Sequence, residues 1–126
     1  MNRRLSGIWI IDGQGKTAYA NESMAEILGT TPAELIGEDS FDYVFPADRE
    51  AAGRLFAMKQ AGSSAPFQFK LQRKDGTPVW VDVQGTPMHN SAGHFIGIVG
   101  TFTVADAAES ETLNGAGMAA DGLRRI

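Results

Sequence analysis

The sequence predicts one α+β domain in which helices cover an antiparallel sheet. Two observations support this prediction. Short helical segments gather between residues 21 and 62, and the segments on either side of them have β patterns, a hairpin before and three β runs after. At 126 residues, the chain is also long enough to bury a core without a disulfide or a metal.

The leading hairpin is predicted from two short apolar runs, residues 8–11 and 17–20, on either side of residues 12–15. The connection reads Asp-Gly-Gln-Gly. Glycine adopts positive φ without steric cost and aspartate can hydrogen-bond its own backbone, so this composition is typical of a tight turn.

Two short helices are predicted next, within residues 22–29 and 30–37. Asn21 is a strong N-cap for the first helix, and the glycine at its end is a natural stop. Thr31 precedes a proline at the first position of the second helix, and Glu34 completes a capping box. Both helices therefore have a start signal in the sequence.

A longer helix is predicted from residue 46 onward. Its apolar stripe consists of Ala51, Leu55 and Met58, and two acidic residues favour its N-terminal end. After it the pattern changes to a period of two, over residues 67–72 and again beyond an Asp-Gly turn. A third β run ends at residue 104, and the three runs predict an antiparallel meander.

Charge and composition exclude several classes of function. The formal net charge is −4 and the basic residues are scattered, so there is no footprint for nucleic acid. The chain has no cysteine, which excludes disulfides, thiolate metal sites and cysteine nucleophiles. No apolar run approaches the roughly 20 residues of a membrane span, and the first apolar run is too short for a signal peptide. We expect a soluble, cytoplasmic protein.

Both histidines lie in one segment, where they are the natural candidates for a metal or acid–base site. His89 and His94 flank Asn-Ser-Ala-Gly, so the predicted hairpin places them on either side of a turn. They lack helical spacing and nearby carboxylate partners, and we expect solvated turn residues and no metal site. Met58 could bind haem iron from the long helix, but a methionine on an apolar stripe is far more often part of the core.

No constellation of catalytic residues is evident. Ser63 and Ser64 lie in a Gly/Ser/Pro-rich loop without a paired histidine and aspartate. We therefore expect no intrinsic enzymatic activity. The clustered acidic residues stand at loop and helix-start positions, where carboxylates act as caps: Asp39, Asp42, Asp48 and Glu50.

In their order and spacing, these segments resemble the PAS domain family over about residues 7–106. Tyr19-Ala20-Asn21 is similar to the end of the family's second strand, and EILGTTPAELIG to its leucine–glycine run and short helix. FPADRE resembles a segment in which a histidine is common at the position of Phe45. The segment from RKDGTPVWV to Asp106 looks like the closing three strands.

The resemblance implies a five-stranded antiparallel sheet in the order 2-1-5-4-3 with helices on one face. It divides the chain into an N-terminal flank (1–6), a PAS domain (7–106) and a C-terminal linker (107–126). It also implies a sensory or regulatory module of a bacterial-type signalling protein. Such a module binds a small ligand or relays a conformational change to an effector domain outside this chain, such as a histidine kinase or a cyclic-nucleotide enzyme. The alternative is a ligand-free scaffold for dimerisation or protein interaction.

The chain departs from the family at points that bear on cofactors and output. Ser40 lies near the position of the photoadduct cysteine in the light-sensing LOV branch, and the long helix has no haem-binding histidine. No cofactor is therefore expected, although non-covalent flavin stays open as an alternative, with Trp80 and Asn21 as unspecific hints. Residues 106–109 read Asp-Ala-Ala-Glu where the family often has D-I-T-E, so the family's threonine contact to an output helix does not carry over to this sequence.

The helices and the inward face of the sheet define a candidate ligand pocket, with a solid core as the alternative. The predicted lining is aromatic and aliphatic, which favours a small and largely apolar ligand. Its residues are Val44, Phe45, Leu55, Phe56, Met58, Phe69, Leu71, Val81 and Val83.

The opposite face of the sheet is the candidate homodimer interface. Trp80 points outward by alternation, and residues 8–11 are apolar on both faces, so they contribute either Trp9 with Ile11 or Ile8 with Ile10. Soluble monomers seldom expose a contiguous apolar patch, so we expect a second copy, or else the segment after Asp106, to cover it. The predicted interface residues are Trp9, Ile11, Trp80 and Phe102.

Overall fold

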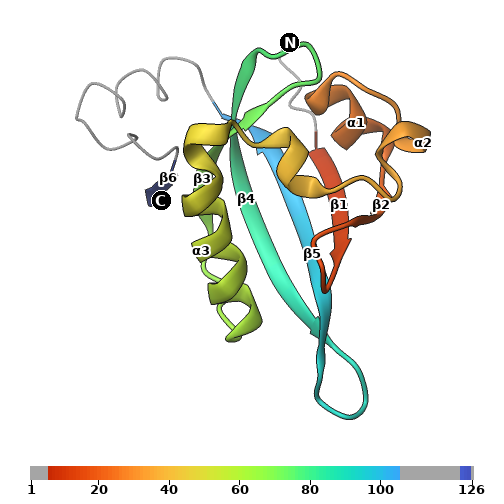
Figure 1. The fold of residues 1–126 in the computed structure, drawn as a ribbon, viewed down its shortest axis with the longest axis vertical. Helices are drawn as coiled ribbons and strands as arrows, with labels where there is room; N and C mark the ends of the chain where they lie inside the picture. Colours follow the sequence, from red (N-terminus) through yellow and green to blue (C-terminus); the bar gives the residue numbers. More distant parts are fainter. Residues whose placement is uncertain (1–5, 106–122, 126) are drawn as a thin grey trace.

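The computed structural model describes residues 6–105 and 123–125, and one antiparallel sheet forms its framework (Figure 1). The strand order is β2-β1-β5-β4-β3-β6. The predicted α+β class and the order 2-1-5-4-3 are confirmed. The strands are β1 (Ser6–Asp12), β2 (Thr17–Ala20), β3 (Phe67–Gln72), β4 (Pro78–His89), β5 (Phe95–Val104) and β6 (Leu123–Arg125).

The sixth strand was not predicted. β6 pairs antiparallel with β3, with Phe69 opposite Leu123, in a part of the chain for which the sequence predicted only a linker. The motif departure at residues 106–109 lies outside the described residues, and so do residues 107–122 of the segment that was the alternative cover for the sheet.

The helices all lie between β2 and β3 in the sequence. Figure 1 shows α3 running beside β3 and β4, whereas α1 and α2 lie over β1 and β2. None of the helices in the described part of the chain is long and apolar enough to cross a membrane. The helical segments are α1 (Glu22–Leu28), α2 (Pro32–Leu35) and α3 (Arg49–Gln60), with two 3-10 turns, η1 (Ser40–Tyr43) and η2 (Pro46–Asp48).

The predicted helix caps are present. Asn21 Oδ1 accepts hydrogen bonds from the backbone N–H groups of Met24 at 2.9 Å and Ile8 at 3.0 Å, so one side chain both starts α1 and fastens it to β1. Thr31 Oγ1 accepts from the backbone N–H of Glu34 at 3.2 Å. Gly29 closes α1 with a φ of 75°, a left-handed conformation that glycine adopts at low cost.

Strand register decides which side chains point toward the helices. Trp9 lies opposite Gly100 on β5, and Phe69 lies opposite Val81 on β4. The side chains of Trp9, Phe69 and Val81 are buried, so this face of the sheet is the one that the helices cover. The largest apolar side chains that are completely buried come mostly from α1 and α2: Met24, Ile27, Leu28, Leu35 and Val81.

Candidate functional site

A cavity of about 130 Å³ lies between α3, η1 and the inner face of the sheet. Its wall is almost entirely apolar, with side chains from β1, β3, β4 and β5 on one side and from η1 and α3 on the other. For comparison, an apolar cavity of roughly 150 Å³ in a protein core holds one benzene molecule. The hollow in this chain therefore suits a body about the size of one aromatic ring.

Two glycines face one another across the sheet side of the cavity. Gly85 on β4 pairs with Gly100 on β5, and both belong to the cavity wall. A Cβ atom at Gly100 would lie 2.7 Å from Cε1 of Phe102, and one at Gly85 would lie 3.3 Å from Cε of Lys59. The absence of side chains at this pair leaves room for the phenyl ring and the lysine.

Two aromatic residues of the cavity wall, Trp9 and Phe56, pack against further rings. The indole N–H of Trp9 donates to Thr17 Oγ1 at 2.9 Å, and its ring lies 6.1 Å from Tyr43 in an edge-on arrangement. Phe56 of α3 lies 5.7 Å from Phe95, again edge-on. Hydrogen bonding holds the Trp9 ring in place, so the wall on the β1 side is preformed.

Lys59 is the charged residue of the cavity wall. Its side chain is buried, with 4% of the residue exposed, and Nζ donates to the carbonyl oxygen of Ala65 at 3.1 Å. Burial lowers the pKa of this ammonium below its ordinary value of 10.5. Sequence reasoning missed Lys59, although the buried stripe of α3 continues to it with helical spacing from Ala51 through Leu55.

Six of the nine predicted lining residues line this cavity, and three do not. Met58 is 45% exposed, because it lies one position outside the stripe that ends at Lys59. Phe45 lies instead under the ammonium of Lys70, 5.1 Å from Nζ to the ring centroid. Val81 is completely buried in the core beside the cavity. The six that line it are Val44, Leu55, Phe56, Phe69, Leu71 and Val83.

The predicted composition of the outer face is wrong at three positions. Trp9, Ile11 and Phe102 all line the cavity, so they point toward the helices and not away from them. The sequence pattern left two options for β1, and the register selects Ile8 and Ile10 as the outward pair. Trp80 alternates with buried Val79 and Val81 and is half-buried.

The histidines lie at the β4–β5 turn, as predicted. His89 is the last residue of β4, and His94 precedes β5. The turn is organised by Asn90, whose Oδ1 accepts from the backbone N–H groups of Ala92 and His94. Within residues 6–105, no group of three or more histidine, aspartate or glutamate side chains could hold a metal ion.

The acidic residues near η1 and α3 differ in role. Asp39 Oδ1 accepts from the backbone N–H of Phe41 at 3.0 Å, which is the predicted capping role. Asp48 makes no side-chain cap; its carboxylate is buried and lies 3.6 Å from Lys70 Nζ. This pair fixes the start of α3 against β3.

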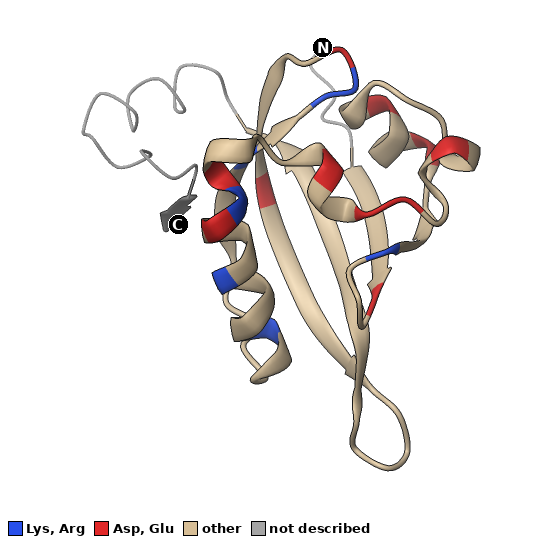
Figure 2. Cartoon of the chain, in the orientation of Figure 1, with Lys and Arg blue, Asp and Glu red and all other residues tan. Residues whose placement is uncertain are grey.

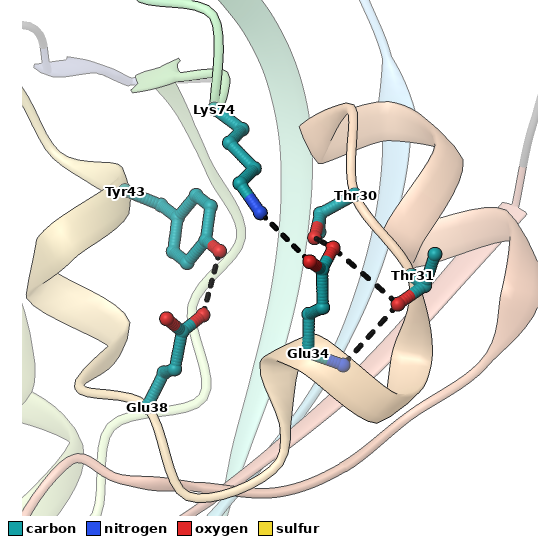
Figure 3. A network of polar contacts seen from close by, with 6 residues as sticks. All are labelled: Thr30, Thr31, Glu34, Glu38, Tyr43 and Lys74. Atoms are coloured by element: carbon teal, nitrogen blue, oxygen red, sulfur yellow. Dashed lines mark hydrogen bonds and ion pairs between the residues drawn. The ribbon is translucent and has the colours of Figure 1, made fainter.

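A polar network fastens the opposite end of the helical layer (Figure 3). Tyr43 donates to Glu38 at 2.7 Å, and burial followed by that hydrogen bond raises the pKa of Tyr43 to about 12. Glu34 accepts from Thr30 at 2.7 Å and from Lys74 at 3.0 Å, and these two partners lower the pKa of Glu34. The Glu34–Lys74 contact joins α2 to the residues that follow β3, and the Tyr43–Glu38 contact joins η1 to the segment that follows α2.

Comparison with known proteins identifies the family. The PAS fold model matches residues 6–104. The chain belongs to the PAS family. PAS domains are sensory and signalling modules, and the predicted resemblance is confirmed.

Individual relatives are more distant. The chain is 30% identical over 94 residues to the uncharacterized protein y4lL of Sinorhizobium fredii, covering 74% of this chain and 11% of that protein. It is 30% identical over 77 residues to hypoxia-inducible factor 1-alpha of Xenopus laevis, covering 60% of this chain and 10% of that protein. This PAS chain thus spans about a tenth of the length of these relatives.

A solved PAS structure shares the fold. A variant of the PAS-B domain of Drosophila melanogaster Cycle, with bound glycerol, superposes with a TM-score of 0.68. The two chains are 18% identical, over 79% of this chain and 99% of that one. At this identity the likeness concerns the fold alone.

Proposed function

We propose that this PAS domain is a ligand-binding sensory module, whose cavity accepts a small and largely apolar molecule. The observation that supports this proposal is the hollow itself, of about 130 Å³, with an apolar wall in a region that a purely structural domain would fill. The domain that receives the signal of ligand binding would be an effector domain in a longer protein, such as a histidine kinase or a cyclic-nucleotide enzyme. A cytoplasmic location and the absence of a catalytic step are part of the same proposal.

The size of the cavity favours a small ligand over flavin. A single aromatic ring fits a volume near 130 Å³, whereas flavin has three fused rings. The Cycle PAS-B domain has bound glycerol, which is consistent with small molecules entering this fold.

Native mass spectrometry of the freshly purified chain tests the proposal, together with an absorbance scan. We expect a bound mass of a small organic molecule that is lost on denaturation, and no flavin band in the visible spectrum. If the purified chain carries no ligand, a panel of one-ring compounds is added and the shifts of the amide resonances are measured. A bare chain that no compound of the panel perturbs would contradict ligand sensing.

The second candidate function is a homodimerisation scaffold, and the outer face of the sheet favours it. Ile8 is 36% exposed and Tyr19 is 47% exposed, on neighbouring strands. Ile8→Glu should shift a dimer to monomer in sedimentation velocity while the circular dichroism spectrum is retained. The inward residue Trp9 is not part of this surface. A parent chain that sediments as a monomer at high concentration excludes the scaffold.

A further inference from the structure

Lys59, a residue of the cavity wall, carries a positive charge that no anion among the described residues balances. No carboxylate in residues 6–105 forms an ion pair with Lys59. Figure 2 shows why: the acidic residues lie mostly on helices and loops, and the long strands beneath α3 are nearly free of charge. β5 carries no charged residue, and β4 carries Asp82 alone.

The contacts that Lys59 does make are weak ones for an ammonium. Nζ has three N–H donors, and one of them is used by the carbonyl of Ala65. The ring of Phe67 lies 5.4 Å from Nζ and adds a cation–π contact. A buried ammonium normally needs an anionic partner to offset its desolvation, and these neutral groups supply only part of that.

The direction of the side chain also matters. Lysines on helices usually extend to water, with only the methylene stem covered. Here the distal end turns toward the sheet, since a Cβ atom at Gly85 would lie 3.3 Å from Cε and 3.8 Å from Nζ. The ammonium therefore lies close to Gly85 of β4, and Lys59 belongs to the wall of the hollow.

We propose that the cavity binds a small organic acid with one negative charge, whose carboxylate pairs with Lys59 and whose apolar body fills the hollow. The inference rests on the proposed ligand-binding function and names its ligand class. One ammonium balances one charge, and charge-assisted hydrogen bonds to a carboxylate are stronger than the neutral contacts that Nζ now makes. The volume limits the body to about one ring or a short alkyl chain.

Benzoate and benzamide are the probes, because they have nearly the same shape and differ in charge. Their affinities for the whole chain are measured at constant ionic strength by calorimetry or by amide chemical shifts. We expect benzoate to bind at least about tenfold more tightly than benzamide, as a charge-assisted contact requires. The parent chain alone gives this comparison, so it does not depend on any variant folding.

Lys59→Met then assigns the preference to the ammonium. This variant should weaken the affinity for benzoate by about tenfold and change the affinity for benzamide by less than about threefold. Lys74→Met is the matched control, since it removes an exposed lysine remote from the cavity wall and should leave both affinities unchanged.

The outcomes separate the two proposals. Equal binding of both probes, or a benzoate affinity that Lys59→Met leaves intact, overturns the organic-acid inference and leaves ligand binding in place. Failure of both probes and of the whole one-ring panel overturns the proposed function as well.

Discussion

The two ends of the helical layer are packed differently. Over β1 and β2, the methionine, isoleucine and leucine side chains of α1 and α2 are completely buried, and Met24, Leu28 and Leu35 are 0% exposed. Over β3 and β4, α3 buries only Ala51 and Lys59, while Leu55 and Phe56 stay half-buried beside the cavity. One sheet therefore supports a compact end and a hollow end.

The difference is explained by what each end presents to the sheet. α1 and α2 present methionine, isoleucine and leucine, and their ends are fixed by caps and by the network of Figure 3. α3 lies over the glycine pair, where the strands have no side chains to meet it. We infer that the compact end provides stability and that the hollow end is available for a ligand.

Matched leucine truncations should show the largest contrast between the two ends. Leu28→Ala empties a completely buried site, so it should lower the free energy of unfolding by about 3 kcal/mol. Leu55→Ala enlarges a hollow that already exists at a half-buried position, so it should cost about 1 kcal/mol. Urea denaturation of both variants measures the difference.

Circular dichroism serves as the control that both variants keep the fold. Equal losses at the two positions would mean that α3 is packed as tightly as α1, and the division into a compact and a hollow end would be wrong.

The elements of the fold were predictable because their signals are local. Asn21 and Thr31 bond to backbone N–H groups three residues ahead, so a short window of sequence contains the whole cap. The alternation of residues 67–72 is equally local. By contrast, β6 pairs with a strand more than fifty residues away, and no local pattern specifies that partner.

The site was only partly predictable, because its composition depends on which alternate residues of each strand face the helices. A strand that is apolar on both faces, as in residues 8–11, does not reveal which pair points inward, and Trp9 was placed on the wrong face for this reason. Lys59 was overlooked because a helical lysine is normally solvated, and only the opposing Gly85 shows that there is room for it.

Lys59→Met should change the free energy of unfolding by less than the truncation of Leu28, and it should raise that free energy instead of lowering it. Without ligand, the variant replaces a buried ammonium by a similar apolar chain, so it should be more stable at neutral pH by on the order of 1 kcal/mol. The exposed Ala65 carbonyl can bond to water instead. Thermal unfolding of the ligand-free chains measures the gain.

The pH dependence of that gain follows from linkage. The pKa of Lys59 is lowered in the fold, so the unfolded chain binds more protons as pH rises toward the ordinary value of 10.5. The parent should therefore gain stability in that window, and the advantage of Lys59→Met should shrink. A constant advantage across the window, with Lys74→Met as the control, would contradict a buried cation at the hollow end.

The smallest effect at neutral pH is expected for Tyr43→Phe, at the compact end. It removes one hydrogen bond to the exposed carboxylate of Glu38 and should cost roughly 0.5 kcal/mol at pH 7. The pKa of Tyr43 is raised to about 12 in the fold, so between pH 10 and 12 only the unfolded chain ionises this phenol. The parent should lose stability as pH rises through that window, and Tyr43→Phe should lose less.

Urea titrations at pH 9, 10 and 11 measure this difference in stability, with Tyr19→Phe at an exposed phenol as the control. A parallel decline in the parent and in Tyr43→Phe would show that water reaches the phenol, and the compact end would then not be sealed at η1.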